Sequence, residues 1–200
     1  MSWRQNQSGD RFFRRARAEG YRARSAYKLI EIADTYRLPR PGQVVLDLGA
    51  APGSWSQVAL ERVRPGGRVL AVDLQPIARL PGLETLVGDV REASTLEAIR
   101  GALAGPADLA MSDVAPNASG ILVTDQARAI ELASHALAIA RAVLRPGGSF
   151  IVKVFRGEDF DRFLGDVRHA FKKVNVVIPK ATRVESREAY VVARGMQGGI

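Results

Sequence analysis

The chain of 200 residues contains no cysteine and only two histidines, His135 and His169. Without cysteine it can form neither a disulfide nor a thiolate site, and the two histidines do not have the spacing of metal ligands. We therefore expect no metal site. The chain also has no apolar segment near its N-terminus, and no window approaches the roughly eighteen apolar residues that a membrane helix requires. These absences predict a soluble, cytoplasmic protein with no membrane partner.

Acidic residues are too few to balance the basic ones, since 29 Lys and Arg stand against 21 Asp and Glu and give a net charge of +8. Residues 1–40 hold ten basic and four acidic residues, so +6 of this excess lies at one end. Such a distribution is typical of a nucleic-acid-binding arm, with a tail that only aids solubility as the alternative. We predict a flexible basic arm over residues 1–20, in which Arg14, Arg15 and Arg17 contact phosphates.

Apolar runs alternate with helical patterns along residues 21–200, which is enough chain for a single compact domain. The last two strands are joined by a link too short for a crossover helix, so they should be antiparallel. The pattern predicts an α/β, doubly wound, Rossmann-like fold with a mostly parallel seven-stranded sheet and helices on both faces. The expected strands are Val44–Leu48, Arg68–Val72, Thr85–Val87, Leu109–Met111, Phe150–Val154, Val174–Ile178 and Ala189–Ala193. The expected helices are Ser25–Tyr36, Trp55–Val63, Thr95–Leu103, Thr124–Leu144 and Phe160–Phe171.

The stretch Val44–Gln57, VVLDLGAAPGSWSQ, has the pattern of a strand, a tight turn and the start of a helix. Gly49 and Gly53 allow a sharp turn and let a ligand approach the backbone beside the free N–H groups of the following helix. This is typical of a nucleotide-type cofactor site. A dinucleotide loop would have a glycine in place of Ala51, and the charge of Asp47 would repel a pyrophosphate but suit a cationic group. S-adenosylmethionine is therefore our first expectation, and NAD is the second.

Ligands of such sheets bind beyond the carboxyl ends of the strands, so the polar residues at these ends form the candidate site. Asp73 ends the second strand, where a carboxylate can accept hydrogen bonds from both ribose hydroxyls. Asp89 follows the next strand and is placed to accept from the exocyclic amine of an adenine. Asp113 ends a further apolar strand in the same way. Trp55 opens the predicted helix and either contacts the cofactor or packs against the sheet.

The chain has five lysines among its 29 basic residues, so arginine serves wherever a plain positive charge suffices. Lys172, Lys173 and Lys180 lie in polar stretches, whereas Lys28 and Lys153 lie in apolar surroundings, where a cation is costly unless it is paired or needed. Arginine cannot lose its proton at accessible pH, whereas a desolvated lysine beside another cation can act as a base. Lys153 is the candidate general base, with a snorkelling or ion-paired lysine as the alternative.

Four motifs occur in the order LDLGAAPGSWSQ, MSDVAPN, GGSFIVKVF and SREAY. With them the chain resembles the FtsJ/RrmJ family of RNA ribose 2′-O-methyltransferases from about Gly20 to Arg194. The resemblance implies one S-adenosylmethionine-dependent methyltransferase domain over residues 21–200. It implies a catalytic tetrad of Lys28, Asp113, Lys153 and Glu188. It also implies that the cofactor site contains Gly53, Trp55, Asp73, Asp89 and Asp113.

Within the family, the compact size and the short basic arm are most similar to the bacterial enzymes that methylate a uridine ribose in large-subunit (23S) ribosomal RNA. We therefore expect ribosomal RNA, within the large ribosomal subunit, as the partner of a monomeric enzyme. The expected RNA contacts are Arg22, Arg24, Tyr27 and Tyr190, with the two tyrosines stacking on a base. Three alternatives stay open: methylation of transfer RNA or another RNA, a non-catalytic RNA-binding assembly factor, and an NAD-dependent oxidoreductase.

Overall fold

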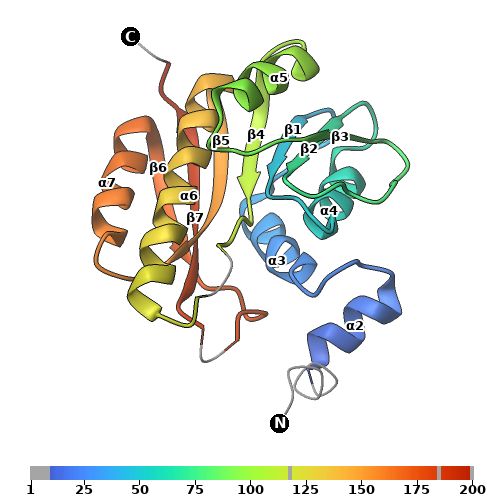
Figure 1. The fold of residues 1–200 in the computed structure, drawn as a ribbon. Helices are drawn as coiled ribbons and strands as arrows, with labels where there is room; N and C mark the ends of the chain where they lie inside the picture. The colour runs from blue at the N-terminus through green and yellow to red at the C-terminus, as the bar shows by residue number, and fades with distance from the viewer. Residues whose placement is uncertain (1–9, 117–118, 184–185, 199–200) are drawn as a thin grey trace.

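The computed structural model describes residues 10–116, 119–183 and 186–198, which form one seven-stranded sheet between two layers of helices (Figure 1). The strand order is β3-β2-β1-β4-β5-β7-β6. Strands β1 to β5 pair in parallel, and β7 pairs antiparallel with both β5 and β6. The predicted mostly parallel sheet is therefore confirmed. The strands are β1 (Val44–Leu48), β2 (Arg68–Asp73), β3 (Leu83–Val87), β4 (Ala107–Ser112), β5 (Leu144–Phe155), β6 (Phe171–Val177) and β7 (Glu188–Met196).

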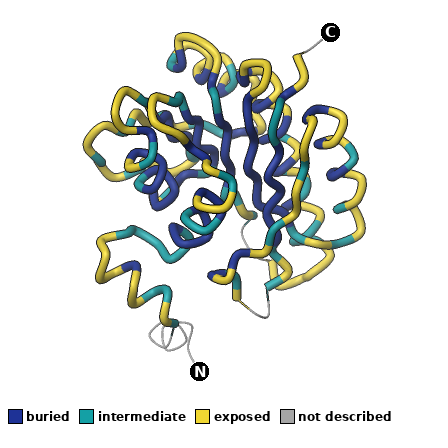
Figure 2. The backbone as a smooth tube through the Cα atoms, turned by 180° about the vertical axis from the view of Figure 1, so that it is seen from behind, coloured by how far each residue is buried: buried dark blue, intermediate teal, exposed yellow. Residues whose placement is uncertain are grey.

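Two sets of helices cover the two faces of the sheet. One face packs against α3 (Ala26–Tyr36) and α4 (Ser54–Val63), and the other packs against α5 (Ala93–Leu103), α6 (Leu122–Val143) and α7 (Phe160–Ala170). The central strands are consequently buried on both sides, as Figure 2 shows by their dark blue colour. Burial on both faces explains why these strands are nearly continuous apolar runs in the sequence, without alternation.

The N-terminal basic segment is helical where the sequence predicts a flexible arm. Helix α2 (Arg11–Glu19) begins at Asp10, whose carboxylate accepts hydrogen bonds of 3.0 and 3.4 Å from two backbone N–H groups of the first turn. Such a cap contributes about 1 kcal/mol to a helix. The buried Ala16 packs in a cluster with Tyr27 of α3 and Ala181. The structure therefore corrects the expected flexibility for residues 11–19, and residues 1–9 lie outside the described part of the chain.

The position of the site follows from the order of the strands. Strands β1 and β4 lie side by side at the centre of the sheet, with β2 and β3 on one side and β5 on the other. The loops that follow β1 and β4 therefore diverge, and a crevice forms between them at the carboxyl end of the sheet. The candidate acids Asp73, Asp89 and Asp113 all lie at this edge.

Asp47 of β1 lies in the core instead of facing the crevice. Its side chain is fully buried, Oδ2 accepts a hydrogen bond of 2.6 Å from the Ser56 hydroxyl, and Oδ1 has no partner. Burial raises the pKa of Asp47 to about 8, with the charges of Asp113 and Asp73 adding to the shift and the Ser56 bond opposing it. The group is therefore largely neutral at pH 7, so it does not supply the negative charge that the sequence suggested for this loop.

We expect this buried carboxyl to make stability depend on pH. Its pKa in the folded protein exceeds the unfolded value of about 3.9, so its contribution to stability is present below about pH 4 and is lost as the pH rises toward 8. The variant Asp47→Asn does not titrate, so its free energy of unfolding relative to the wild type should increase over the same range. Urea unfolding at a series of pH values measures this difference. The exposed Asp34→Asn is the control and should follow the wild-type profile, and parallel curves for Asp47→Asn would contradict the assignment.

Candidate active site

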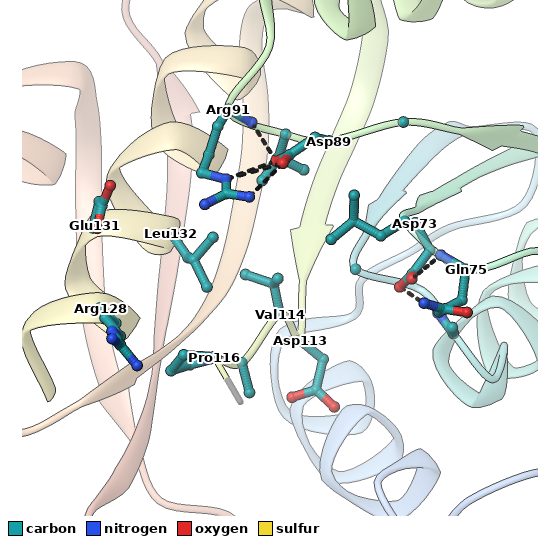
Figure 3. A pocket seen from close by; sticks show the side chains of 16 residues that line it. Asp73, Gln75, Asp89, Arg91, Asp113, Val114, Pro116, Arg128, Glu131 and Leu132 are labelled. Atoms are coloured by element: carbon teal, nitrogen blue, oxygen red, sulfur yellow. Dashed lines mark hydrogen bonds and ion pairs between the residues drawn. The ribbon is translucent and has the colours of Figure 1, made fainter. Parts of the chain in front are cut away.

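A cavity of about 720 Å³ opens beyond the carboxyl ends of β1, β2, β3 and β4 (Figure 3). Cofactors and other small ligands occupy pockets of about 300–1,000 Å³, so this space is large enough for a nucleoside cofactor. Its walls come from the four loops that follow these strands and from one side of α6. They include Gly49, Asp73, Gln75, Gly88, Asp89, Arg91, Asp113, Val114, Pro116, Arg128, Glu131 and Leu132.

Asp73 ties the loop after β1 to the end of β2. One carboxylate oxygen accepts a hydrogen bond of 2.9 Å from the Ala51 N–H group, and the other accepts one of 2.8 Å from the Gln75 N–H group. A carboxylate offers about four lone-pair sites, so Asp73 can still accept hydrogen bonds from a ligand in the cavity. Asp73 lines the cavity, and its binding of ribose hydroxyls stays a prediction.

The glycine loop after β1 keeps its backbone N–H groups for the protein itself. Those of Gly49 and Ala50 donate to one carbonyl oxygen of β2 at 2.8 and 3.2 Å, and that of Ala51 donates to Asp73. Residue 52 is a proline, and the Gly53 N–H group donates to the Ala50 carbonyl oxygen. A pyrophosphate is bound by unpaired N–H groups at such a loop. Residues 49–53 therefore offer a pyrophosphate no unpaired N–H group, which leaves only those of the first turn of α4 for the NAD alternative.

Asp89 is held by a neighbour in its own loop. Arg91 donates to it from the backbone N–H group at 3.0 Å, from Nε at 3.0 Å and from Nη2 at 2.5 Å (Figure 3). These hydrogen bonds lower the pKa of Asp89 to about 2, so the group is ionised at neutral pH and can only accept hydrogen bonds. Arg91 makes four contacts with the two carboxylate oxygens, so an incoming donor would have to replace one of them.

Lys153 and Asp113 meet at the end of the cavity nearest the centre of the sheet. Lys153 Nζ donates to the backbone carbonyl oxygen of Asp113 at 2.6 Å and lies 3.2 Å from its Oδ1. The Tyr190 hydroxyl donates to the same Oδ1 at 2.9 Å. Burial raises the pKa of Tyr190 well above its usual value, and the nearby charges of Asp113 and Glu188 add to this shift. The hydroxyl therefore remains a donor that orients Asp113.

Lys28 and Glu188 form a second pair beside the first. Lys28 Nζ lies 2.5 Å from Glu188 Oε2 and 5.6 Å from the centre of the Tyr190 ring. Tyr190 thus contacts Lys28 through its ring and Asp113 through its hydroxyl. The four side chains of the predicted tetrad come from α3, from the loop after β4, from β5 and from β7. The fold brings them together as two linked pairs.

Two residues expected in the cofactor site do not line the cavity. Trp55 is 1% exposed, its Nε1 donates to the Ser25 carbonyl oxygen at 3.0 Å, and its ring packs on Tyr190. The alternative of packing inside the protein is therefore the correct one. Gly53 begins α4 with a φ of 102°, and a Cβ there would lie 2.7 Å from Arg22 Nη1. The left-handed φ of the turn accounts for a glycine at this position, and its contact with the cofactor stays a prediction.

The two arginines expected to bind RNA already have protein partners. Arg22 donates from Nη1 to the Pro52 carbonyl oxygen at 2.8 Å and from Nη2 to that of Arg79 at 2.9 Å. It therefore joins the loops that follow β1 and β2. Arg24 pairs with Asp10 and also donates to a carbonyl oxygen of the link between β6 and β7. Its contacts hold α2 against the domain.

Base stacking by the two predicted tyrosines does not fit this structure. Tyr190 is fully buried, and Tyr27 is 5% exposed with its hydroxyl donating to Glu19 at 2.9 Å. Neither ring has an open face, because both are packed between other side chains of the domain.

Several cavity residues were not predicted from the sequence. Arg128, Glu131 and Leu132 share one face of α6 because of their spacing along the helix. Nothing in the sequence shows that this face borders the cavity. Gln75 and Arg91 each follow a predicted acid by two residues, and this proximity is the signal that could have identified them.

The described residues contain no group of three His, Cys, Asp or Glu side chains that could hold a metal ion. No helix among them is long and apolar enough to cross a membrane.

Comparison with known proteins identifies the family. The profile of the family described as FtsJ-like methyltransferase matches residues 21–196. A relative from Azoarcus sp. (strain BH72), named ribosomal RNA large subunit methyltransferase E, is 51% identical over 192 residues, which cover 96% of this chain and 94% of the relative. A relative with the same name from Methanothrix thermoacetophila is 51% identical over 185 residues, which cover 92% of this chain and 72% of that one.

Solved structures agree with this grouping. One solved structure is a Plasmodium falciparum protein described as a ribosomal RNA methyltransferase. It superposes on this chain with a TM-score of 0.81 at 26% sequence identity, covering 90% of this chain and all of that one. Aeropyrum pernix fibrillarin, solved with S-adenosylmethionine, has the same fold at a TM-score of 0.59 and 18% identity, over 84% of this chain and 76% of its own. The chain belongs to the FtsJ-like methyltransferase family.

Proposed function

We propose that this protein transfers a methyl group from S-adenosylmethionine to a ribose 2′-hydroxyl of large-subunit ribosomal RNA, at a uridine. The observation that carries the proposal is the contact of Lys153 with Asp113 at one end of a cofactor-sized cavity. Relatives that are about half identical over nearly the whole chain carry the name ribosomal RNA large subunit methyltransferase E. We further propose that the enzyme acts as a monomer in the cytoplasm.

The cavity fits the cofactor chemically. Three of its carboxylates suit the three polar parts of the cofactor: Asp73 the ribose hydroxyls, Asp89 the adenine amine and Asp113 the cationic methionine end. The N–H groups of the glycine loop are paired within the protein, which suits a cofactor that has no phosphate group. When bound, S-adenosylmethionine supplies an electrophilic methyl group.

We assign the remaining steps to the tetrad. Lys153, in its amine form, takes the proton of the 2′-hydroxyl, a contribution typically worth about 10²–10⁴ in rate. Asp113 holds Lys153 in place through two contacts and faces the cavity. Lys28 and Glu188 lie on the other side of Tyr190, where they can bind the ribose. Since methyl transfer is an in-line displacement, correct positioning supplies much of the acceleration.

A non-catalytic assembly factor is the rival from another class. It would bind RNA through the same basic surface, but it has no use for two buried lysines paired with acids, which are costly to bury. A transfer RNA or another RNA is the alternative substrate. Mapping of 2′-O-methyl groups in ribosomal and transfer RNA from cells with and without this protein separates these functions. Loss of one large-subunit methyl group supports the proposal, and an unchanged map contradicts it.

Lys153→Arg tests the base directly. The variant keeps a positive charge but cannot release a proton, so methyl transfer should fall by about 10² or more while the affinities for cofactor and RNA change little. Single-turnover assays at saturating RNA and cofactor measure the chemical step. The exposed Lys173→Arg is the matched control and should react at the wild-type rate. Near-normal chemistry in Lys153→Arg would show that Lys153 supplies only charge.

Asp89→Ala tests the position of the adenine. Loss of one acceptor should weaken binding of S-adenosylhomocysteine by about 1–2 kcal/mol. Calorimetry measures the affinity, with Glu131→Ala as the control because this carboxylate lies in the same cavity on α6. Unchanged affinity in Asp89→Ala would mean that the adenine lies elsewhere.

The exposed arginines of α2 should act through phosphates. Arg14 and Arg17 form no ion pair with the described residues, whereas Arg15 pairs with Glu19. Replacing Arg14 and Arg17 with Ala should weaken RNA binding and reduce its salt dependence by about one unit of slope for each lost contact. Binding to ribosomal RNA at several salt concentrations measures this slope. The control is Arg141→Ala, which removes an exposed arginine in the last turn of α6. An unchanged salt dependence of RNA binding in the α2 variant would show that α2 does not contact RNA.

A further inference from the structure

Three consecutive apolar side chains are exposed at the start of α6. Ile121 is 63% exposed, Leu122 is 51% exposed and Val123 is 68% exposed. We call these three residues the apolar turn. Single exposed apolar residues are normal on a protein surface, but three adjacent ones form a patch that marks an interaction site.

The apolar turn is held in a fixed conformation. The Asp125 carboxylate accepts hydrogen bonds from the Ser119 N–H group at 2.8 Å, from the Ser119 hydroxyl at 2.6 Å and from the Gly120 N–H group at 3.3 Å. The Asp125 N–H group itself donates to the Ile121 carbonyl oxygen at 3.0 Å. These bonds fix the backbone on both sides of the turn, so its side chains are kept outside the core by the local structure.

A chain of contacts joins the apolar turn to the catalytic strands. Gln126 Nε2, in the first turns of α6, donates to the Arg156 carbonyl oxygen at 2.8 Å, just after the end of β5. The Arg156 N–H group donates to the Arg187 carbonyl oxygen at 3.0 Å, one residue before Glu188. The apolar turn therefore lies at the same edge of the sheet as the tetrad, on the side of α6.

Three exposed arginines lie near this position, together with the exposed acids Glu158 and Asp159. Arg128, Arg156 and Arg187 are exposed, and none of them forms an ion pair with a carboxylate of the described residues. Unpaired arginines beside an apolar projection complement a strand of RNA, which has charged phosphates and apolar base faces. A partner protein with an acidic rim would be the other occupant, but the proposed substrate already brings RNA to this edge.

A ribose can reach the tetrad only if its nucleotide leaves the stack of neighbouring bases. Lys28 and Lys153 are only 9% and 8% exposed, so a ribose must enter a recess to reach them. A nucleotide that remains stacked between its neighbours cannot do so without opening the strand. Nucleic-acid-binding proteins open such a gap by inserting aliphatic side chains between bases, at a cost of a few kcal/mol per step.

We propose that the apolar turn inserts beside the target nucleotide, separates its base from the neighbouring base and so lets the ribose reach Lys153. This inference rests on the proposed function, because it takes RNA as the substrate. Arg128, Arg156 and Arg187 bind the flanking phosphates. The apolar turn makes no contact with the cofactor in this arrangement, so it affects the presentation of the ribose alone.

The test uses a variant in which Ile121, Leu122 and Val123 are all replaced by serine. These side chains are exposed, so the fold should be unchanged, and Val176→Ser on the edge strand β6 is the matched control. The substrate is a large-subunit ribosomal RNA fragment with 2-aminopurine next to the nucleotide that the mapping identifies. We expect the variant to bind S-adenosylhomocysteine like the wild type and to bind RNA with an affinity within a few-fold of the wild-type value. Its single-turnover methylation should be reduced by about tenfold or more, because the apolar side chains no longer supply the energy of unstacking. The rise in 2-aminopurine fluorescence that accompanies unstacking should be lost in the variant and kept in Val176→Ser.

Other outcomes overturn the inference. Equal rates and equal fluorescence would show that the apolar turn does not open the RNA, and loss of RNA affinity with an unchanged fluorescence rise would make it a docking surface only. Sedimentation that shows a wild-type dimer and a monomeric serine variant would make the apolar turn an interface between copies of this chain. If the wild-type protein itself methylates no RNA, the proposed function fails, and this result is distinct from each of the others.

Discussion

The contacts of Asp113 connect the two halves of the site. Its carbonyl oxygen and its carboxylate both contact Lys153, the carboxylate also accepts from Tyr190, and the residue lines the cavity. Through Tyr190 it is linked to Lys28, which pairs with Glu188. Lys153 and Tyr190 are buried, so without Asp113 both would lose a partner that water cannot replace. In the proposed function, Asp113 therefore sets the relative position of cofactor and ribose. This residue follows β4, at the point where the strand order of the sheet changes direction.

Environment gives similar acids different properties in this fold. Asp47 lies near the end of β1 and Asp89 follows β3, and both look alike in sequence as acids at strand ends. Asp47 is fully buried with one donor, and its pKa rises to about 8, whereas Arg91 supplies several hydrogen bonds to Asp89 and lowers its pKa to about 2. Desolvation controls the first group and hydrogen bonding controls the second. An ionised carboxylate only accepts hydrogen bonds, which supports the proposed role of Asp89 toward the adenine amine, whereas the neutral Asp47 suits the core.

The arginines also differ in role according to their surroundings in the fold. Arg22 and Arg24 lie closest to Lys28 in sequence, yet their guanidinium groups bind carbonyl oxygens and Asp10 and hold loops and α2 in place. The exposed arginines on α2 and near the apolar turn are the ones that we propose to bind RNA. A count of charges predicts a polyanionic partner, but it does not tell which arginine is structural.

The sequence by itself determined the sheet, the family and the identity of the tetrad, because these depend on local periodicity and on motifs that are contiguous in the chain. Lys28 and Lys153 stood out as lysines in apolar surroundings and Asp113 as an acid after an apolar strand, whereas only the family resemblance pointed to Glu188. The fold brings these four residues together. Tertiary structure alone decided which candidates face the cavity: Trp55 and Tyr190 turned inward, and one face of α6 became a wall. It also decided that Asp47 is neutral and that the glycine loop offers no free N–H group. These properties depend on distances between segments remote in sequence and on burial, which local pattern does not record.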